Sequence, residues 1–273
     1  MTTPSSFRIY QLDAFTDQLF AGNPAAVVAL TDTNEWLPDA RMQSIAAENN
    51  LAETAFYIRT DTGYHIRWFT PTVEVDLCGH ATLATGYVVF FLEEKPDASQ
   101  ITFDSRSGPL SVCREEGDWL VLDFPADVLH KAAVNPPALA AGLNGPKPLE
   151  IHKGKTDFMV VYASQADVES LTPDFRELAT VPARGIIVTA PGTDVDFVSR
   201  FFGPQSGIDE DPVTGSAHTT LIPYWAEKLD KTTLIARQLS ARGGFLRCKF
   251  KEDQGRVEIA GKVQLYLKGE LVQ

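Results

Sequence analysis

Two copies of one pattern decide the fold. The first copy is FTPTVEVDLCGHAT at Phe69–Thr82, and the second is FGPQSGIDEDPVTGSAH at Phe202–His218. The separation from the opening phenylalanine to Cys78 equals the separation to Asp211 in the second copy. Each copy follows a strand-like run and leads into an apolar, helix-like run. The repetition predicts two similar halves, with a polar turn from each half meeting at one site in a cleft.

The helix-like run after each copy is apolar on nearly every side. These runs are Ala81–Leu92 and about Ala217–Leu229, with Pro223 near the first turns of the second, where proline is least harmful. A helix that is apolar all round belongs inside a protein rather than on its surface. The remaining runs of each half alternate like strands, which fits neither regular βαβ order nor a sandwich.

These patterns predict an α+β protein with two similar halves, each made of many strands and one strongly buried helix. The stretch Pro125–Pro148 is rich in Pro, Ala, Gly and Asn and is the predicted junction. The halves are then 1–127, with Glu53 and the Cys78-Gly79-His80 turn, and 128–273, with the Asp211-Gly215-Ser216 turn. An alternative for the last strand is that it packs back on the first half.

Composition narrows the class of protein. The chain has 273 residues, 44% hydrophobic and 22% charged, with a net charge of −12. Such an acidic chain argues against nucleic acid and anionic membranes as partners, because both attract clustered Lys and Arg. Three cysteines indicate no disulfide framework. The first six residues lack a signal-peptide pattern, and no apolar run spans a bilayer. We therefore expect a cytoplasmic protein.

The two turns are candidate anion-binding sites. The first backbone N–H groups of a helix lack intrahelical acceptors, and the helix dipole favours negative charge there. Gly79 and Gly215 allow close approach of a ligand to the backbone, and Ser216 is placed as an N-cap or a hydroxyl donor. Ordinary helix capping is the alternative interpretation, and the matched pair argues against it. The turns are expected to hold a carboxylate and to stabilise charge developing on it.

Glu53 is the candidate acid–base group. It lies in NNLAETAF at Asn49–Phe56, and no Lys or Arg follows before Arg59. A carboxyl group among neutral and apolar neighbours has a raised pKa and exchanges protons near neutral pH. An exposed glutamate at the start of a strand is the alternative interpretation.

Other polar residues have weaker signals. His80 is a candidate for proton transfer or substrate donation, and His218 follows the second glycine. Asn23, with Asp13, is a candidate for shaping the site from a loop. The sequence has no convincing metal-ligand spacing, P-loop, dinucleotide fingerprint or nucleophile elbow. We predict neither a metal nor a cofactor.

Six motifs, in order along the chain, resemble one known family. They are QLDAF at Gln11–Phe15, GNPAAVV at Gly22–Val28, NLAET at Asn50–Thr54, FTP at Phe69–Pro71, LCGHAT at Leu77–Thr82 and EDPVTGSAH at Glu210–His218. Together they are similar to the phenazine-biosynthesis isomerase-like (PhzF-like) family, which shares its fold with diaminopimelate epimerase and proline racemase. The resemblance implies two similar domains, each a curved, mostly antiparallel sheet wrapped around a central helix. It also implies an active site in the cleft between the domains, and a homodimer.

The resemblance also implies roles for particular residues. Glu53 matches the glutamate that moves a proton in the phenazine enzyme without cofactor or metal, and His80, Asp211 and Ser216 match other site residues. In the epimerases each half supplies a cysteine, whereas this chain has Cys78 in one half and Asp211 in the other. A two-thiol racemase is therefore not supported.

Three hypotheses follow. The leading one is a cofactor-independent isomerase that moves a proton on a small carboxylate-bearing substrate, with Glu53 as base and then acid, and Asp211 orienting the substrate or relaying a proton. The second is an amino-acid racemase or epimerase that uses Cys78 and Asp211. The third is a non-catalytic member that binds a metabolite or a protein.

Overall fold

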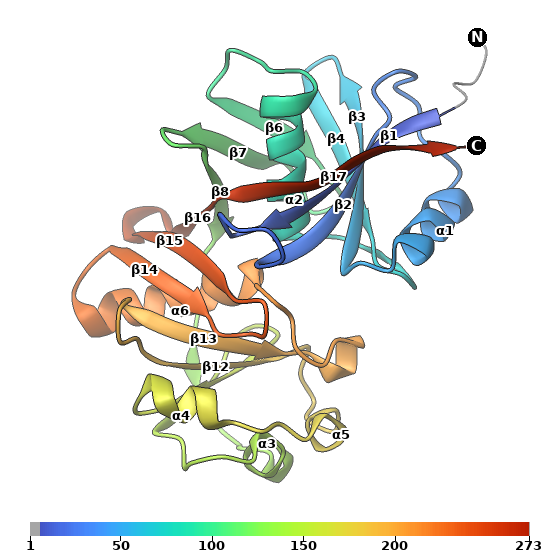
Figure 1. Ribbon diagram of the computed structural model, residues 1–273. Helices are drawn as coiled ribbons and strands as arrows, with labels where there is room; N and C mark the ends of the chain where they lie inside the picture. The colour runs from blue at the N-terminus through green and yellow to red at the C-terminus, as the bar shows by residue number, and fades with distance from the viewer. Residues whose placement is uncertain (1–5, 273) are drawn as a thin grey trace. The chain divides into compact units, whose positions relative to one another are not determined.

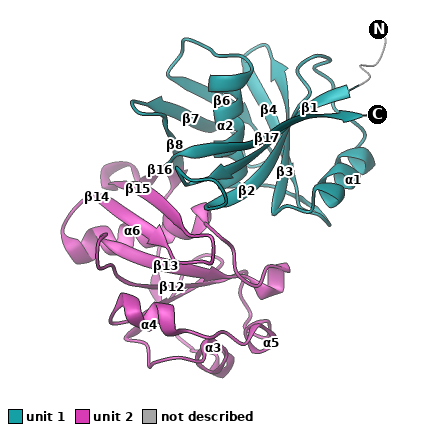
Figure 2. Ribbon diagram, in the orientation of Figure 1, with its two compact units in different colours: residues 1–123, 260–273 teal, residues 124–259 magenta. Residues whose placement is uncertain are grey.

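The chain forms two compact units in the computed structural model, which describes residues 6–272 (Figures 1 and 2). The first unit runs up to Asp123 and resumes at Ala260, and the second is Phe124–Ile259. Sequence analysis instead places one boundary between residues 127 and 128. Most of the N-terminal stretch that lacks a signal-peptide pattern, residues 1–5, lies outside the described residues, as does residue 273.

The first unit contains a strongly buried helix, α2, a peripheral helix, α1, and the strands that precede and follow them in the chain (Figure 1). Its elements are β1 (Ser6–Ala14), β2 (Asn23–Ala29), α1 (Asp39–Asn49), β3 (Glu53–Thr60), β4 (Gly63–Phe69), β5 (Glu74–Val75), α2 (Gly79–Tyr87), η1 (Val88–Leu92), β6 (Gln100–Asp104), β7 (Leu110–Glu115), β8 (Trp119–Pro125) and β17 (Val263–Val272).

The second unit has the same kind of composition, with short helices added between its early strands. Its elements are β9 (His130–Lys131), α3 (Pro137–Leu143), β10 (Glu150–Lys153), β11 (Phe158–Val161), α4 (Gln165–Ser170), α5 (Phe175–Leu178), β12 (Ile186–Pro191), β13 (Phe197–Phe202), η2 (Pro204–Ser206), α6 (Gly215–Leu229), β14 (Thr233–Gln238), β15 (Gly244–Lys251), η3 (Glu252–Gln254) and β16 (Arg256–Gly261). Strand β8 carries the chain into this unit, and β16 carries it out.

Strand pairing repeats between the units. In the first unit, β1–β2, β3–β4 and β6–β7 are antiparallel, while β2–β3 and β4–β6 are parallel. In the second unit, β10–β11, β12–β13 and β14–β15 are antiparallel, while β11–β12 and β13–β14 are parallel. The order of pairings is therefore the same, and the central helix precedes the equivalent strand in each unit. The predicted two similar, mostly antiparallel halves are confirmed.

Both central helices are buried, as predicted, and both begin earlier than predicted. Helix α2 begins at Gly79 and continues as the π-helical turn η1, in which Val88, Val89 and Phe90 are buried. Helix α6 begins at Gly215 and ends at Leu229. In each case the polar turn itself supplies the first helical residues, so the glycines belong to the helix N-terminus.

One detail of the sequence interpretation is wrong, and another is incomplete. Pro223 lies well inside α6 rather than near its first turns, because the helix begins at Gly215. The stretch Pro125–Pro148 is not a bare junction: it contains β9 and α3, whose Leu139 and Leu143 lie in the apolar core of the second unit. Its alanines build a helix, and its prolines stand at the helix start.

The last strand, β17, belongs to the first unit. It pairs antiparallel with β1 over the full length of that strand, from Ser6 opposite Val272 to Ala14 opposite Val263. Strand β1 also pairs with β2, so β17 covers its second edge.

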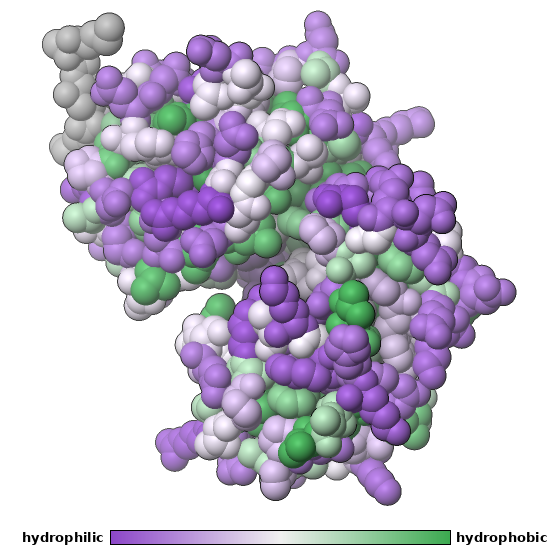
Figure 3. All heavy atoms as spheres, turned by 180° about the vertical axis from the view of Figure 1, so that it is seen from behind, coloured by the Kyte–Doolittle hydropathy of each residue, from purple (hydrophilic) through white to green (hydrophobic). Residues whose placement is uncertain are grey.

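Hydrophilic side chains dominate the visible face of each unit, and apolar side chains are scattered among them (Figure 3). Among residues 6–272, no helix has the length and apolar character needed to cross a membrane.

Candidate functional site

Glu53 is the first residue of β3, directly after the tight end of α1. Asn50 adopts the left-handed conformation (φ 49°) and donates its N–H to the Ala46 carbonyl, which ends the helix. Asn49 Nδ2 donates to Thr54 Oγ1 at 3.0 Å, which holds the short connection against the strand. Strand β3 lies parallel to β2 with Glu53 opposite Ala25. The carboxyl group is thus fixed at a strand end, with its side chain 12% exposed.

Cys78 and His80 stand at the N-terminus of α2. Cys78 is the extended N-cap residue (φ −144°), and its carbonyl accepts from the N–H and the hydroxyl of Thr82 at 3.1 and 2.6 Å. The thiol is not used for capping. Cys78 and His80 are both buried. The helix start therefore presents a thiol and an imidazole two residues apart, with Gly79 between them.

These three side chains meet. His80 Nε2 lies 3.2 Å from Glu53 Oε2, and His80 Nδ1 lies 3.5 Å from Cys78 Sγ. Complete burial lowers the pKa of His80 from 6.5 to about 4, although a hydrogen bond with the Pro24 backbone opposes the shift. The imidazole is therefore neutral near pH 7, and its contact with Glu53 is not an ion pair. His80 Nε2 makes no aligned hydrogen bond within residues 6–272.

Asn23 belongs to the same neighbourhood. It is fully buried at the start of β2, next to Pro24, whose backbone contacts His80. Asp13 shapes the preceding loop, because its Oδ2 accepts from the Phe20 N–H at 2.9 Å. Gly22 has a φ of 65°, and a Cβ there would lie 2.2 Å from the Ala14 carbonyl oxygen.

In the second unit, Asp211 is held by its own turn and by β14. Thr214 Oγ1 donates to Asp211 Oδ2 at 2.6 Å, and Gln238 Nε2 donates to the Asp211 carbonyl at 2.8 Å. The Thr214 N–H donates to Gln238 Oε1 at 2.9 Å, so Gln238 fixes both ends of the turn. The carboxyl group is half-buried and fixed in orientation.

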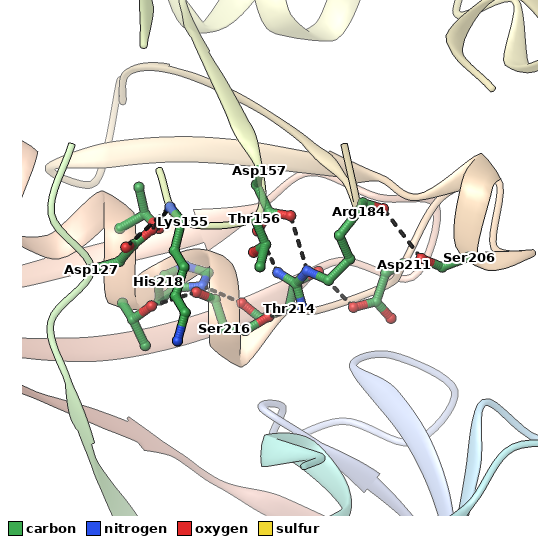
Figure 4. Close-up of polar contacts among 12 residues, drawn as sticks. Asp127, Lys155, Thr156, Asp157, Arg184, Ser206, Asp211, Thr214, Ser216 and His218 are labelled. Carbon is green, nitrogen blue, oxygen red and sulfur yellow. Dashed lines mark hydrogen bonds and ion pairs between the residues drawn. The ribbon is translucent and has the colours of Figure 1, made fainter. Parts of the chain in front are cut away.

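Ser216 lies in the first turn of α6, next to the buried Gly215. The N-cap residue Thr214 makes no side-chain hydrogen bond to the helix, so the first N–H groups of α6 are left to other partners. Ser216 Oγ accepts a hydrogen bond from Arg184 Nη1 at 3.0 Å (Figure 4). A cationic side chain, a hydroxyl group and a helix N-terminus therefore converge, which favours an anion.

Sequence reasoning missed Arg184 and its partner Asp157. Arg184 Nε donates to Asp157 Oδ1 at 2.9 Å, and Nη2 pairs with the other carboxylate oxygen (Figure 4). Asp157 is 3% exposed, so the guanidinium is anchored from the interior. Arg184 lies 27 positions from Asp157 and 32 positions from Ser216 in the sequence, so no local spacing indicates these contacts.

His218 has a structural role. Its Nδ1 donates to the Thr214 carbonyl at 2.8 Å, and its ring lies 5.9 Å from the Phe197 ring. Complete burial lowers the pKa of His218 from 6.5 to about 4. The residue ties the start of α6 to the sheet as a neutral imidazole.

The first unit thus gathers Glu53, Cys78, Gly79 and His80, with Asn23 close by. The second gathers Asp211, Gly215 and Ser216, to which the structure adds Arg184. A buried neutral imidazole beside a carboxyl group can exchange protons, and an anchored guanidinium beside a helix N-terminus can hold a carboxylate.

The chain matches the phenazine biosynthesis-like protein family over residues 12–269. It is 51% identical to an uncharacterised isomerase of Pseudomonas aeruginosa, covering 96% of this chain and 98% of that protein. It is 44% identical to an uncharacterised isomerase of Halalkalibacterium halodurans, covering 100% and 99%. A crystal structure of a PhzF family protein from Enterococcus faecalis is 46% identical, with a TM-score of 0.92 over 98% of this chain and 100% of that one.

More distant structures share the fold. A probable proline racemase from Agrobacterium radiobacter superposes with a TM-score of 0.64 at 10% identity, over 97% of this chain and 93% of that one. The predicted epimerase-like α+β fold is confirmed.

Proposed function

Because the chain belongs to the phenazine biosynthesis-like protein family, we propose that it is an isomerase that moves a proton on a small carboxylate-bearing substrate, with Glu53 as the acid–base group. The observation that carries this proposal is the 3.2 Å approach of His80 Nε2 to Glu53 Oε2 at a buried, neutral imidazole.

In the proposed reaction, Glu53 removes a proton from one carbon of an unsaturated amino or hydroxy acid and returns it to another carbon. The same carboxyl group serves as base and then as acid, so the enzyme ends each turnover in its starting state. His80 Nε2, which no described residue occupies with an aligned hydrogen bond, holds a polar group of the substrate.

The second unit is proposed to bind the substrate carboxylate. Ser216 donates its hydroxyl proton, and the first N–H groups of α6 after Gly215 face negative charge favourably. Arg184 contributes a positive charge to carboxylate binding, and its guanidinium is held in place by Asp157 and Ser216. Asp211, which Thr214 orients, contacts the substrate amine or hydroxyl group or relays a proton.

Cofactor independence, a cytoplasmic location and a homodimer are parts of the same proposal. Exhaustive treatment with a chelator should not lower the rate. Light scattering should give about twice the chain mass of 29.9 kDa.

The direct test is a screen of candidate metabolites in D₂O for protein-dependent uptake of deuterium. Glu53→Gln keeps the size of the side chain and removes the exchangeable proton, so it should slow uptake at least about 10²-fold, with little change in KM. The matched control is Glu48→Gln, because Glu48 is an exposed residue of α1.

A racemase acting through Cys78 and Asp211 is the alternative, favoured by the contact between Cys78 Sγ and His80. Under the leading proposal, Cys78→Ala should be much milder than Glu53→Gln. Full activity in Glu53→Gln together with an inactive Cys78→Ala would replace the isomerase by the racemase.

A further inference from the structure

Cys78 is a buried nucleophile that the proposed proton shift does not use. Its Sγ lies 3.5 Å from His80 Nδ1, and the imidazole approaches Glu53 on its other side. One potential ligand atom from each of Glu53, Cys78 and His80 lies within 4.8 Å of the other two. Within residues 6–272, this is the one group of three or more His, Cys, Asp and Glu side chains that converges so closely.

We propose that Glu53, Cys78 and His80 form a zinc-binding site whose occupation switches the enzyme off. The binding part of this proposal stands on the geometry of the three side chains. The inhibitory part rests on the proposed function, because it requires that Glu53 carry the transferred proton.

The spacing suits a tetrahedral ion. Zinc–ligand bonds of about 2.0–2.3 Å at tetrahedral angles place neighbouring donor atoms roughly 3.3–3.8 Å apart. The observed Nε2–Oε2 distance of 3.2 Å is already of this size. The remaining separations are at most 4.8 Å, so modest side-chain rotations of Cys78 and Glu53 bring all three atoms to one ion. One imidazole nitrogen binds the ion, and the other keeps a protein partner.

The donor set selects the metal. Thiolate and imidazole ligands favour Zn²⁺ over Mg²⁺ and Ca²⁺, which prefer oxygen donors. The N-terminus of α2 disfavours a cation, but it also favours the Cys78 thiolate. With Glu53 ionised, the two anionic ligands balance the two charges of the ion. Three protein ligands leave a fourth position for water.

Zinc binding at this site removes the proposed base and a proposed substrate contact at the same time. The Glu53 carboxylate becomes a metal ligand and is no longer a base, and His80 loses the freedom of its ring nitrogen. Substrate and zinc should therefore compete.

The binding test uses the full-length, chelator-treated protein, titrated with Co²⁺ and then with Zn²⁺ against a chromophoric chelator. One ion should bind per chain, with a near-ultraviolet thiolate-to-cobalt charge-transfer band. Cys78→Ser should abolish the band and weaken zinc binding at least about tenfold. A tenfold loss of metal affinity is the lower end of the range even for residues that only hydrogen-bond to a ligand. Cys113→Ser is the matched control, because Cys113 lies in β7, outside the cluster, and should bind as the wild type does.

A second ligand variant guards against misfolding. Glu53→Gln should also weaken zinc binding at least about tenfold while circular dichroism and the melting temperature show a folded protein. Unchanged zinc affinity in both Cys78→Ser and Glu53→Gln, or no saturable binding to the wild type, would overturn the site.

Inhibition is measured separately, as deuterium uptake with added zinc. Zinc should suppress uptake competitively in the wild type and in Cys113→Ser. Binding through Cys78 without any inhibition would overturn the inhibitory part. The Glu53→Gln rate measured without zinc decides the proposed function independently, so failure of one does not imply failure of the other.

Discussion

At the scale of single residues, Arg184 tests how the second unit binds an anion. Its guanidinium donates to Ser216 Oγ at 3.0 Å while the buried Asp157 holds its other nitrogens. The serine oxygen is thus an acceptor toward Arg184, and its own proton is directed elsewhere, toward the proposed substrate carboxylate. Arg184→Lys keeps the charge but loses the planar fork. We expect KM to rise about tenfold, equivalent to about 1.4 kcal/mol, with a smaller change in kcat.

The control for this prediction is Arg176→Lys, at an exposed arginine of the same unit. Steady-state kinetics on the substrate found in the D₂O screen separates KM from kcat. An Arg184→Lys enzyme with an unchanged KM would remove Arg184 and Ser216 from the carboxylate site.

His218 predicts a dependence of stability on pH. Its pKa is about 4 in the folded chain against 6.5 in the unfolded chain, so the unfolded state binds the proton first as pH falls. The free energy of unfolding should therefore decrease between pH 6.5 and about 4, and His218 should contribute nothing above that window. A shift of this size corresponds to about 3 kcal/mol. His218→Asn keeps a donor for the Thr214 carbonyl and should make the profile from urea unfolding at each pH shallower. A similar dependence should remain from His80, whose pKa burial also lowers to about 4. A variant with the wild-type slope would contradict the assignment.

The repeated turn makes Cys78, His80, Asp211 and Ser216 visible in the sequence, because equal spacing in two halves is a local signal. The approach of Glu53 to His80 is not local, since it depends on where β3 begins relative to the start of α2. The pair of Asp157 and Arg184 leaves no pattern at all, because its members stand next to different strands. The roles of all these residues in catalysis and binding stay predictions.

At the scale of elements, α2 packs so closely on β7 that one glycine is needed. A Cβ at Gly86 would lie 2.8 Å from Val112 Cγ1. On an exposed helix, Gly→Ala would stabilise by up to about 1 kcal/mol. Here Gly86→Ala should lower the free energy of unfolding by about 1–3 kcal/mol, because the added methyl group overpacks the contact. Urea denaturation of the purified variant measures the change.

The companion variant is Val112→Ala, which removes the opposing methyl groups. In the double variant the two costs should be less than additive by at least about 0.5 kcal/mol, since the space vacated by valine accepts the alanine. Additive costs would mean that Gly86 matters for another reason.

Periodicity predicts the strands and both central helices well, because each is long and strongly patterned. The π-helical turn after Tyr87 is invisible to it, since apolar residues on every side fit several helical periods. Helix α3 is missed because alanine and proline in Pro125–Pro148 resemble a linker until Leu139 and Leu143 find a core.

At the scale of the whole molecule, the last strand of the chain, β17, completes the sheet of the first unit. Each residue of β1 from Ser6 to Ala14 has a partner in β17 within the register of the pair. No periodicity in the sequence shows this closure, because β17 follows second-unit strands without a break in pattern. Its cause is the open edge of β1, whose unpaired N–H and C=O groups are a liability until another strand covers them.

Truncation after Lys262 tests this closure. Removing residues 263–273 should leave β1 exposed along that edge and destabilise the first unit. The second unit should be less affected, because it keeps all its strand pairings from β10 to β15. Hydrogen exchange should show lost amide protection in β1 and β2 and retained protection in β11–β13. A truncation after Leu271 is the matched control and should behave as the full chain, because it removes only the last pair of the register. Full protection of β1 in the longer truncation would show that the first unit closes without its final strand.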